Sequence, residues 1–169
     1  MTQPFVAILM GSDSDLPTMQ ATFDVLKSFG IRYEVRIHSA HRTPQATHDY
    51  VTGAEQRGCQ VFIAAAGLAA HLAGAVSAIT VRPVIGVPMD GGPLKGQDAL
   101  LSTVQMPGGI PVATVAIGKA GAKNAGYLAA QIMAVSDAEL AQKLRDERTA
   151  NAEKILRRNA ELQKELGLG

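Results

Sequence analysis

The stretch FVAILMGSDSD, residues 5–15, decides the fold of this chain. Its first six residues are apolar, and its last five are polar or glycine. Apolar residues then recur at helical spacing, at Leu16, Met19, Phe23, Leu26 and Phe29. This pattern predicts a buried strand, a turn and an amphipathic helix. Gly11 allows the chain to turn sharply, and Ser12 and Asp15 provide a hydroxyl and a carboxylate where the helix begins.

A second polar loop, HSAHRTP at residues 38–44, follows a β-type run. Its Thr43-Pro44 pair predicts a helix start, with the threonine hydroxyl as cap and proline in the first helical position. The free N–H groups of a helix N-terminus attract anions, so together with Ser39 and Arg42 they predict a phosphate site. His41, beside that anion, is the candidate proton carrier. The alternative is a surface turn before a capped helix, with no chemistry.

The rest of the chain keeps alternating between strands and helices. We expect further strands from Val61, over Val84–Val87 and over Val112–Ile117, and helices over Gly96–Gln105 and Ala120–Val135. This alternation predicts a flavodoxin-like three-layer α/β/α sandwich with a parallel five-stranded sheet. Its switch point would lie beside the first strand, which places loops 11–15, 39–43 and 66–74 on one edge.

The C-terminal segment predicts one long helix. Ser136-Asp137-Ala138-Glu139 has the pattern of a capping box, and an apolar stripe follows as far as Leu166. Such a helix would be roughly 45 Å long, comparable to the diameter of the domain. We therefore expect a single domain, 1–169, with its α/β core over about 5–135 and a helix over 137–166 that packs on a neighbouring subunit. A break near Asn151 with a frayed tail is the alternative.

Two loops outside the predicted elements also suggest an interface. The segments Pro88–Gly96 and Met106–Pro111 are rich in glycine and proline and nearly uncharged. We expect them to be buried against another chain.

Composition excludes several classes of partner. The net charge is +1 and tryptophan is absent, which argues against nucleic acid. The single cysteine, Cys59, gives no disulfide framework and no thiolate zinc site. His38 and His41 have no carboxylate or cysteine beside them, so we expect no metal.

The run Val61–Val81 contains no charged residue over a length that could span a bilayer. It is rich in alanine and includes a histidine, a serine and two glycines, so we interpret it as a buried strand followed by a buried helix. We expect no membrane segment. Because no signal-type leader precedes the first strand, we expect a cytoplasmic protein.

Five motifs stand in order along the chain: GSDSD at 11–15, SAHRTP at 39–44, AAHLAG at 69–74, VQMPGGIPV at 104–112 and AIGKAGAKNA at 116–125. Together they resemble the PurE family, the N5-carboxyaminoimidazole ribonucleotide mutases of purine biosynthesis, over about residues 5–144. The resemblance implies transfer of a carboxyl group from the exocyclic N5 of the ribonucleotide to ring C4, without cofactor or metal. It also implies a flavodoxin-like homo-octamer with sites at subunit interfaces.

The resemblance also implies roles for individual residues. Phosphate and ribose contacts fall to Ser12, Asp15, Ser39 and Arg42, and the general acid/base is His41. The remaining substrate-binding residues that it implies are Ala40, Ala66, Gly67, His71 and Leu72.

The third loop departs from the family pattern, which more often reads G-G-A-A-H-L-P-G. This chain has Leu68 and Ala73 in place of a glycine and the proline. Leu68 puts a side chain where glycine allows the backbone to approach closely.

The chemistry of the transfer suits these residues. The carbamate loses carbon dioxide once N5 is protonated, C4 attacks the trapped gas, and the C4 proton then leaves. One imidazole can serve both proton steps, because both of its forms are accessible near neutral pH. An apolar cavity would retain the gas; we expect its lining to be Ala66, Gly67, Ala69, Ala70 and Leu72.

Three alternatives remain open. A second branch of the family carboxylates aminoimidazole ribonucleotide directly with carbon dioxide, but its pattern lacks the His71-Leu72 pair. A non-enzymatic flavin or nucleotide carrier would need flanks that stack on a ring. A purely structural interaction domain would leave His41 and Arg42 without a role.

Overall fold

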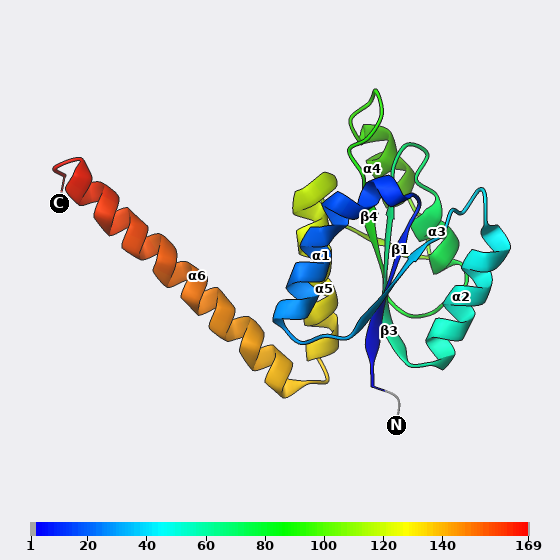
Figure 1. Ribbon diagram of the computed structural model, residues 1–169, viewed down its shortest axis with the longest axis horizontal. Helices are drawn as coiled ribbons and strands as arrows, with labels where there is room; N and C mark the ends of the chain where they lie inside the picture. Colours follow the sequence, from blue (N-terminus) through cyan, green and yellow to red (C-terminus); the bar gives the residue numbers. More distant parts are fainter. Residues whose placement is uncertain (1–2, 169) are drawn as a thin grey trace. The chain divides into compact units, whose positions relative to one another are not determined.

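Five parallel strands form one sheet in the order β2-β1-β3-β4-β5. Figure 1 shows the computed structural model, which describes residues 3–168. The strands are β1 (Phe5–Met10), β2 (Tyr33–Ile37), β3 (Cys59–Ala66), β4 (Val84–Pro88) and β5 (Ala113–Thr114). This order confirms the flavodoxin-like sheet, with its switch point beside β1.

Helices cover both faces of the sheet (Figure 1), which confirms the three-layer sandwich. One face carries α1 (Leu16–Ser28) and α5 (Gly118–Ala134), which are joined where Thr22 Oγ1 donates to the Ala122 carbonyl at 2.6 Å. The other carries α2 (Pro44–Gln56), α3 (Leu72–Ser77) and α4 (Gln97–Val104). Right-handed crossovers require this distribution for the observed strand order.

The core forms because β1 and β3 are apolar on both faces. Phe5, Ala7 and Leu9 of β1 join one buried cluster with side chains of α2 and α3, such as Val51 and Val76. The alternate residues of β1 point to the opposite face, toward α1 and α5, because successive side chains of a strand alternate. Cys59 is buried in the first cluster, as expected of a small apolar residue, and burial raises its pKa to about 11.

The fifth strand is shorter than predicted. Only Ala113 and Thr114 pair with β4, whereas the apolar run predicts a strand over Val112–Ile117. β5 lies at the sheet edge with a single neighbour, and Val112 packs against the core cluster instead. The following helix, α5, begins at Gly118, two residues before the predicted start.

The C-terminal helix, α6 (Ala138–Glu165), lies in a separate unit that starts at Ala134. It runs unbroken past Asn151, so the predicted long helix is confirmed and the predicted alternative of a break is wrong. The capping box is also wrong: Asp137, not Ser136, caps the helix, and its carboxylate accepts from Leu140 N–H at 3.0 Å. A carboxylate on the residue directly before the first turn can accept from this N–H by itself, so the helix needs no glutamate or glutamine that reaches back to the cap.

None of the helices within residues 3–168 is long and apolar enough to cross a membrane. The charge-free run Val61–Val81 contains most of β3, a loop, the short α3 and the four residues after it. Its interpretation as a strand and a helix is therefore confirmed.

Candidate active site

The carboxyl ends of β1, β2, β3 and β4 surround one cavity of about 800 Å³. Every predicted catalytic or substrate-binding residue lines it: Ser12, Asp15, Ser39, Ala40, His41, Arg42, Ala66, Gly67, His71 and Leu72. The three loops therefore meet on one edge, as the strand order predicts. What each residue does for a ligand stays a prediction.

The β1–α1 loop is a capped turn. Ser12 Oγ accepts from Ser14 N–H at 3.3 Å, and Asp15 Oδ2 accepts from Ser12 N–H at 3.2 Å. This reciprocal pair caps a short 3-10 helix, Asp13–Asp15, just before α1. Asp15 is buried, and its pKa is raised mainly by burial and further by the charge of Asp13, while the Ser12 N–H opposes the shift.

The β2–α2 loop is closed by side chains, and one prediction about it is wrong. The Thr43 hydroxyl does not cap α2; it accepts from Ser39 N–H at 3.0 Å and donates to the Ser39 carbonyl at 3.2 Å. The loop turns back on itself, so the Thr43 hydroxyl lies against the backbone of Ser39 and not at the first turn of α2. The first turn of α2 therefore has no side-chain cap, and its N–H groups stay open to an anion.

Arg42 joins the first two loops. Its backbone N–H and its Nε donate to Ser39 Oγ at 3.1 and 3.4 Å, and its Nη2 donates to the Gly11 carbonyl at 3.2 Å. These contacts hold an exposed guanidinium beside the start of α2. A phosphate there would meet both a fixed cation and the helix N-terminus.

The third loop brings a second imidazole to His41. His41 Nε2 lies 2.7 Å from His71 Nδ1, and the two rings meet edge to face. One of these nitrogens must carry a hydrogen and the other must accept it, so a proton on His41 can pass to His71. The sequence predicts His71 in the same pocket but gives no signal for this contact between residues 30 positions apart.

The other two histidines lie elsewhere. His38 stacks on Tyr50, and burial together with the nearby Arg36 lowers its pKa. His48 is exposed on α2 beside Asp49. Within the part of the chain that the structure describes, no three His, Cys, Asp or Glu side chains gather as metal ligands would.

Leu68 has an unusual backbone in the third loop. Its φ is 56°, in the left-handed region that favours glycine, and its side chain is 54% exposed at the cavity. The side chain lies so close to Gly92 that a Cβ at position 92 would collide with Leu68 Cδ2. A glycine would adopt this backbone freely, whereas Leu68 adopts it at a cost.

The expected apolar lining is partly wrong. Ala66, Gly67, Ala69 and Leu72 line the cavity, but Ala70 does not. Ala70 is 2% exposed and turned toward α4. Its place in the loop is structural.

Sequence reasoning missed the loop after β4. Met89, Asp90, Gly91 and Gly92 line the cavity, although the segment Pro88–Gly96 is predicted only as an interface. The missed signal is topological: β4 is the neighbour of β3, so its carboxyl end opens on the same edge. Gly11, Ser14, Thr18 and Leu68 complete the lining.

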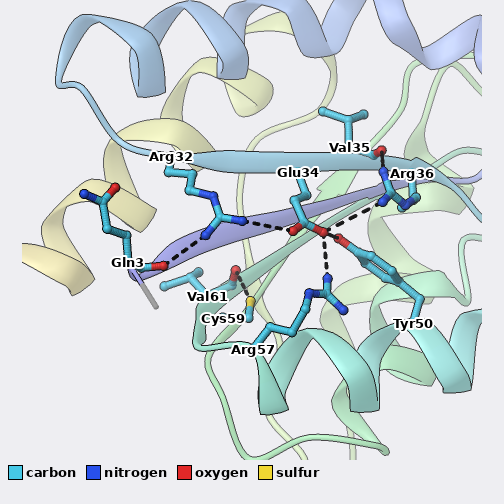
Figure 2. Close-up of polar contacts among 9 residues, drawn as sticks. All are labelled: Gln3, Arg32, Glu34, Val35, Arg36, Tyr50, Arg57, Cys59 and Val61. Atoms are coloured by element: carbon cyan, nitrogen blue, oxygen red, sulfur yellow. Dashed lines mark hydrogen bonds and ion pairs between the residues drawn. The ribbon is translucent and has the colours of Figure 1, made fainter. Parts of the chain in front are cut away.

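A group of charged side chains gathers around Glu34 of β2 (Figure 2). Glu34 accepts from Arg57 Nη2 at 2.7 Å and from the Tyr50 hydroxyl at 3.1 Å, and Arg32 and Arg36 lie within 4 Å. Burial, and then the charge of Glu34, raises the pKa of Tyr50. These contacts tie the edge strand to α2 just before the His41 loop.

Comparisons with known proteins agree on one family. Residues 5–154 match the model of a family described as AIR carboxylase. An N5-carboxyaminoimidazole ribonucleotide mutase of Bacillus subtilis (strain 168) is 53% identical over 154 residues, which cover 91% of this chain and 94% of that protein. The mutase of Thermotoga maritima is 51% identical over 160 residues, 95% of this chain and 92% of the relative. The crystal structure of Treponema denticola PurE is 34% identical, with a TM-score of 0.86 over 95% of this chain and 99% of its own.

Proposed function

We propose that this chain, which belongs to the AIR carboxylase family, is an N5-carboxyaminoimidazole ribonucleotide mutase of purine biosynthesis. Family membership confirms the resemblance that the five motifs indicate. The observation that carries the proposal is the contact between His41 and His71, which line one cavity together with Ser39 and Arg42. Such a pair can move protons on a ribonucleotide whose phosphate is held nearby.

Substrate binding falls to the first two loops. The phosphate lies at the start of α2, against Arg42 and Ser39, because this is where positive charge and open N–H groups coincide. Ser12 adds its hydroxyl. Asp15 accepts from Ser12 N–H through Oδ2, which leaves Oδ1 for a ribose hydroxyl.

His41 carries out both proton steps. It protonates N5 as the bond from N5 to the carboxyl carbon breaks, and the electron pair of that bond stays on nitrogen. Carbon dioxide is released, C4 forms a bond to its carbon, and the proton on C4 returns to His41. His71 can take or return a proton between these steps, because its Nδ1 lies 2.7 Å from His41 Nε2.

The reaction needs no cofactor in this proposal. Ala66, Gly67, Ala69 and Leu72 form the apolar part of the cavity lining, where carbon dioxide is retained while C4 attacks. The same residues could also serve direct carboxylation of aminoimidazole ribonucleotide. The His71-Leu72 pair and the names of the relatives favour the mutase.

Two assays test the proposal. The purified protein should convert the carbamate ribonucleotide to 4-carboxy-5-aminoimidazole ribonucleotide, and it should be inactive with aminoimidazole ribonucleotide plus bicarbonate. The opposite preference would establish the direct carboxylase instead. The absorbance spectrum of the purified protein would reveal a bound flavin and so a carrier.

His41→Asn isolates the acid/base role. We expect the rate to fall by at least about a hundredfold while ligand affinity and melting temperature stay nearly unchanged, because an exposed imidazole contributes little to folding. His48→Asn, on the exposed side of α2, is the matched control. Near-normal turnover of the His41 variant would remove the central assignment.

We propose further that the chain works in the cytoplasm as a homo-octamer. Exposed apolar side chains support an assembly. They occur on α4 and its flanking loops, at Leu94, Leu101, Val104 and Ile110, and along α6, at Ile155, Leu156, Leu162 and Leu166. Large exposed apolar surfaces are typical of subunit interfaces.

Truncation after Val135 tests the role of α6 in assembly. We expect the shortened chain to form smaller oligomers and to lose activity, as measured by light scattering and by the mutase assay. A fully active monomer would refute the assembly.

A further inference from the structure

The loop that carries His71 is held by α4, on the side away from the cavity. Ala70 N–H donates to Ser102 Oγ at 2.9 Å, and Ala70 is buried. His71 is the next residue in the chain and directly precedes α3. The position of Ala70, which Ser102 fixes, therefore sets the position of the His71 backbone. Ser102 itself does not line the cavity.

The Ser102 hydroxyl is suited to accept this bond. It has one hydrogen, and its nearest acceptor is the Asp98 carbonyl at 2.6 Å, one helical turn earlier. Donation to Asp98 leaves the oxygen lone pairs for Ala70 N–H. Thr103 Oγ1 lies 3.4 Å from the Ala70 carbonyl oxygen, with the Ala99 carbonyl as its nearer acceptor at 2.7 Å.

The loop requires such an anchor because its conformation is costly. Leu68 holds a left-handed backbone that a residue with a side chain rarely adopts. If this buried N–H lost its acceptor, it could not form a hydrogen bond with water instead, so the loop would rearrange. Any rearrangement at Ala70 moves the His71 imidazole relative to His41.

We propose that Ser102 is a positioning residue for the proton-transfer step: by fixing the backbone at Ala70 it sets the contact between His71 and His41. The inference rests on the proposed function. Ser102 acts on the site through the loop of His71, whereas the proposed phosphate contacts, Ser39 and Arg42, lie on another loop. Loss of Ser102 therefore affects turnover more than substrate affinity.

Ser102→Ala tests the inference, with Ser28→Ala as the matched control. Ser28 also donates to a carbonyl of its own helix, Val25 at 2.8 Å, and, like Ser102, does not line the cavity. For Ser102→Ala we expect kcat to fall about tenfold or more, since misplaced catalytic groups cost at least this much. The dissociation constant of the product ribonucleotide, measured by calorimetry, should change less than about twofold, and the control should match the parent in both.

A spectroscopic readout separates positioning from general stability. Imidazole ¹H–¹⁵N correlation spectra should show a hydrogen bond between His41 and His71 in the parent and in Ser28→Ala. The same signals should be lost in Ser102→Ala. Ser102→Thr, which keeps a hydroxyl, should retain both the signals and the parent kcat.

Several results would overturn the inference. One is that Ser102→Ala keeps the parental kcat and the parental ring signals. Another is that its affinity for the product ribonucleotide falls as much as its kcat. If Ser102→Ala does not fold, amide exchange in the unmodified protein decides: slow exchange at Ala70 supports the bond and fast exchange refutes it. A parent inactive on both ribonucleotides would refute the proposed function, whereas the ring spectra would still test the role of Ser102.

Discussion

Thr103 of α4 packs directly against Gly86 of β4, and Gly86→Ala tests how tightly the helix and the sheet pack. A Cβ at position 86 would collide with Thr103 Cγ2 and would lie 2.9 Å from Val112 Cγ1. Both neighbours are β-branched and stiff at χ1, and the Thr103 hydroxyl is held by the Ala99 carbonyl at 2.7 Å. Because neither can turn away, we expect the free energy of unfolding to fall by about 2–3 kcal/mol, the upper part of the range for an overpacked core.

Urea unfolding and calorimetry would measure this loss at one fixed protein concentration, because assembly links apparent stability to concentration. The melting temperature should fall by roughly 4–12 °C. Gly108→Ala is the control: a Cβ there meets nothing within 4 Å, so its effect should stay within about 0.5 kcal/mol. Adding Thr103→Ser removes the colliding methyl and should restore part of the loss. A Gly86→Ala protein as stable as the control would refute the packing argument.

Three further predictions concern the site itself. Arg42→Lys should raise KM about tenfold with little change in kcat, because an ammonium cannot reproduce the guanidinium's bidentate hold on phosphate; equal KM values in steady-state assays would contradict the phosphate assignment. Asp15→Asn should raise KM yet leave the protein at least as stable as the parent near neutral pH. Burial raises the pKa of Asp15 above 3.8, so the protonated carboxyl stabilises the folded state below pH 3.8, and this contribution is lost as the pH rises from 3.8 through the raised pKa. Urea unfolding above and below the window checks the sign, and an advantage of asparagine that persists well below pH 3.8 would count against it. Exhaustive chelation should change neither rate nor melting temperature, and activity restored by a divalent ion would show that a metal takes part.

The fold and the identity of the site loops could be predicted from the sequence because they depend on sums over many residues. Each apolar position of FVAILM adds burial free energy in the same direction, so the pattern survives local exceptions. Parallel topology then places the carboxyl ends of neighbouring strands on one edge, whatever the loops contain. For the same reason all ten predicted site residues line one cavity.

Tertiary structure alone decided how those residues meet. The contact between His41 and His71 joins positions 30 apart, and the bond from Ala70 to Ser102 joins positions 32 apart. Neither contact has a periodic signature, because each depends on the path of a loop and on the rotamer of one side chain. The Thr43 hydroxyl shows the limit: its sequence position predicts a helix cap, but the curl of the loop brings Ser39 closer. A single hydrogen bond contributes only about 1 kcal/mol, so the whole fold determines which partner a polar group takes.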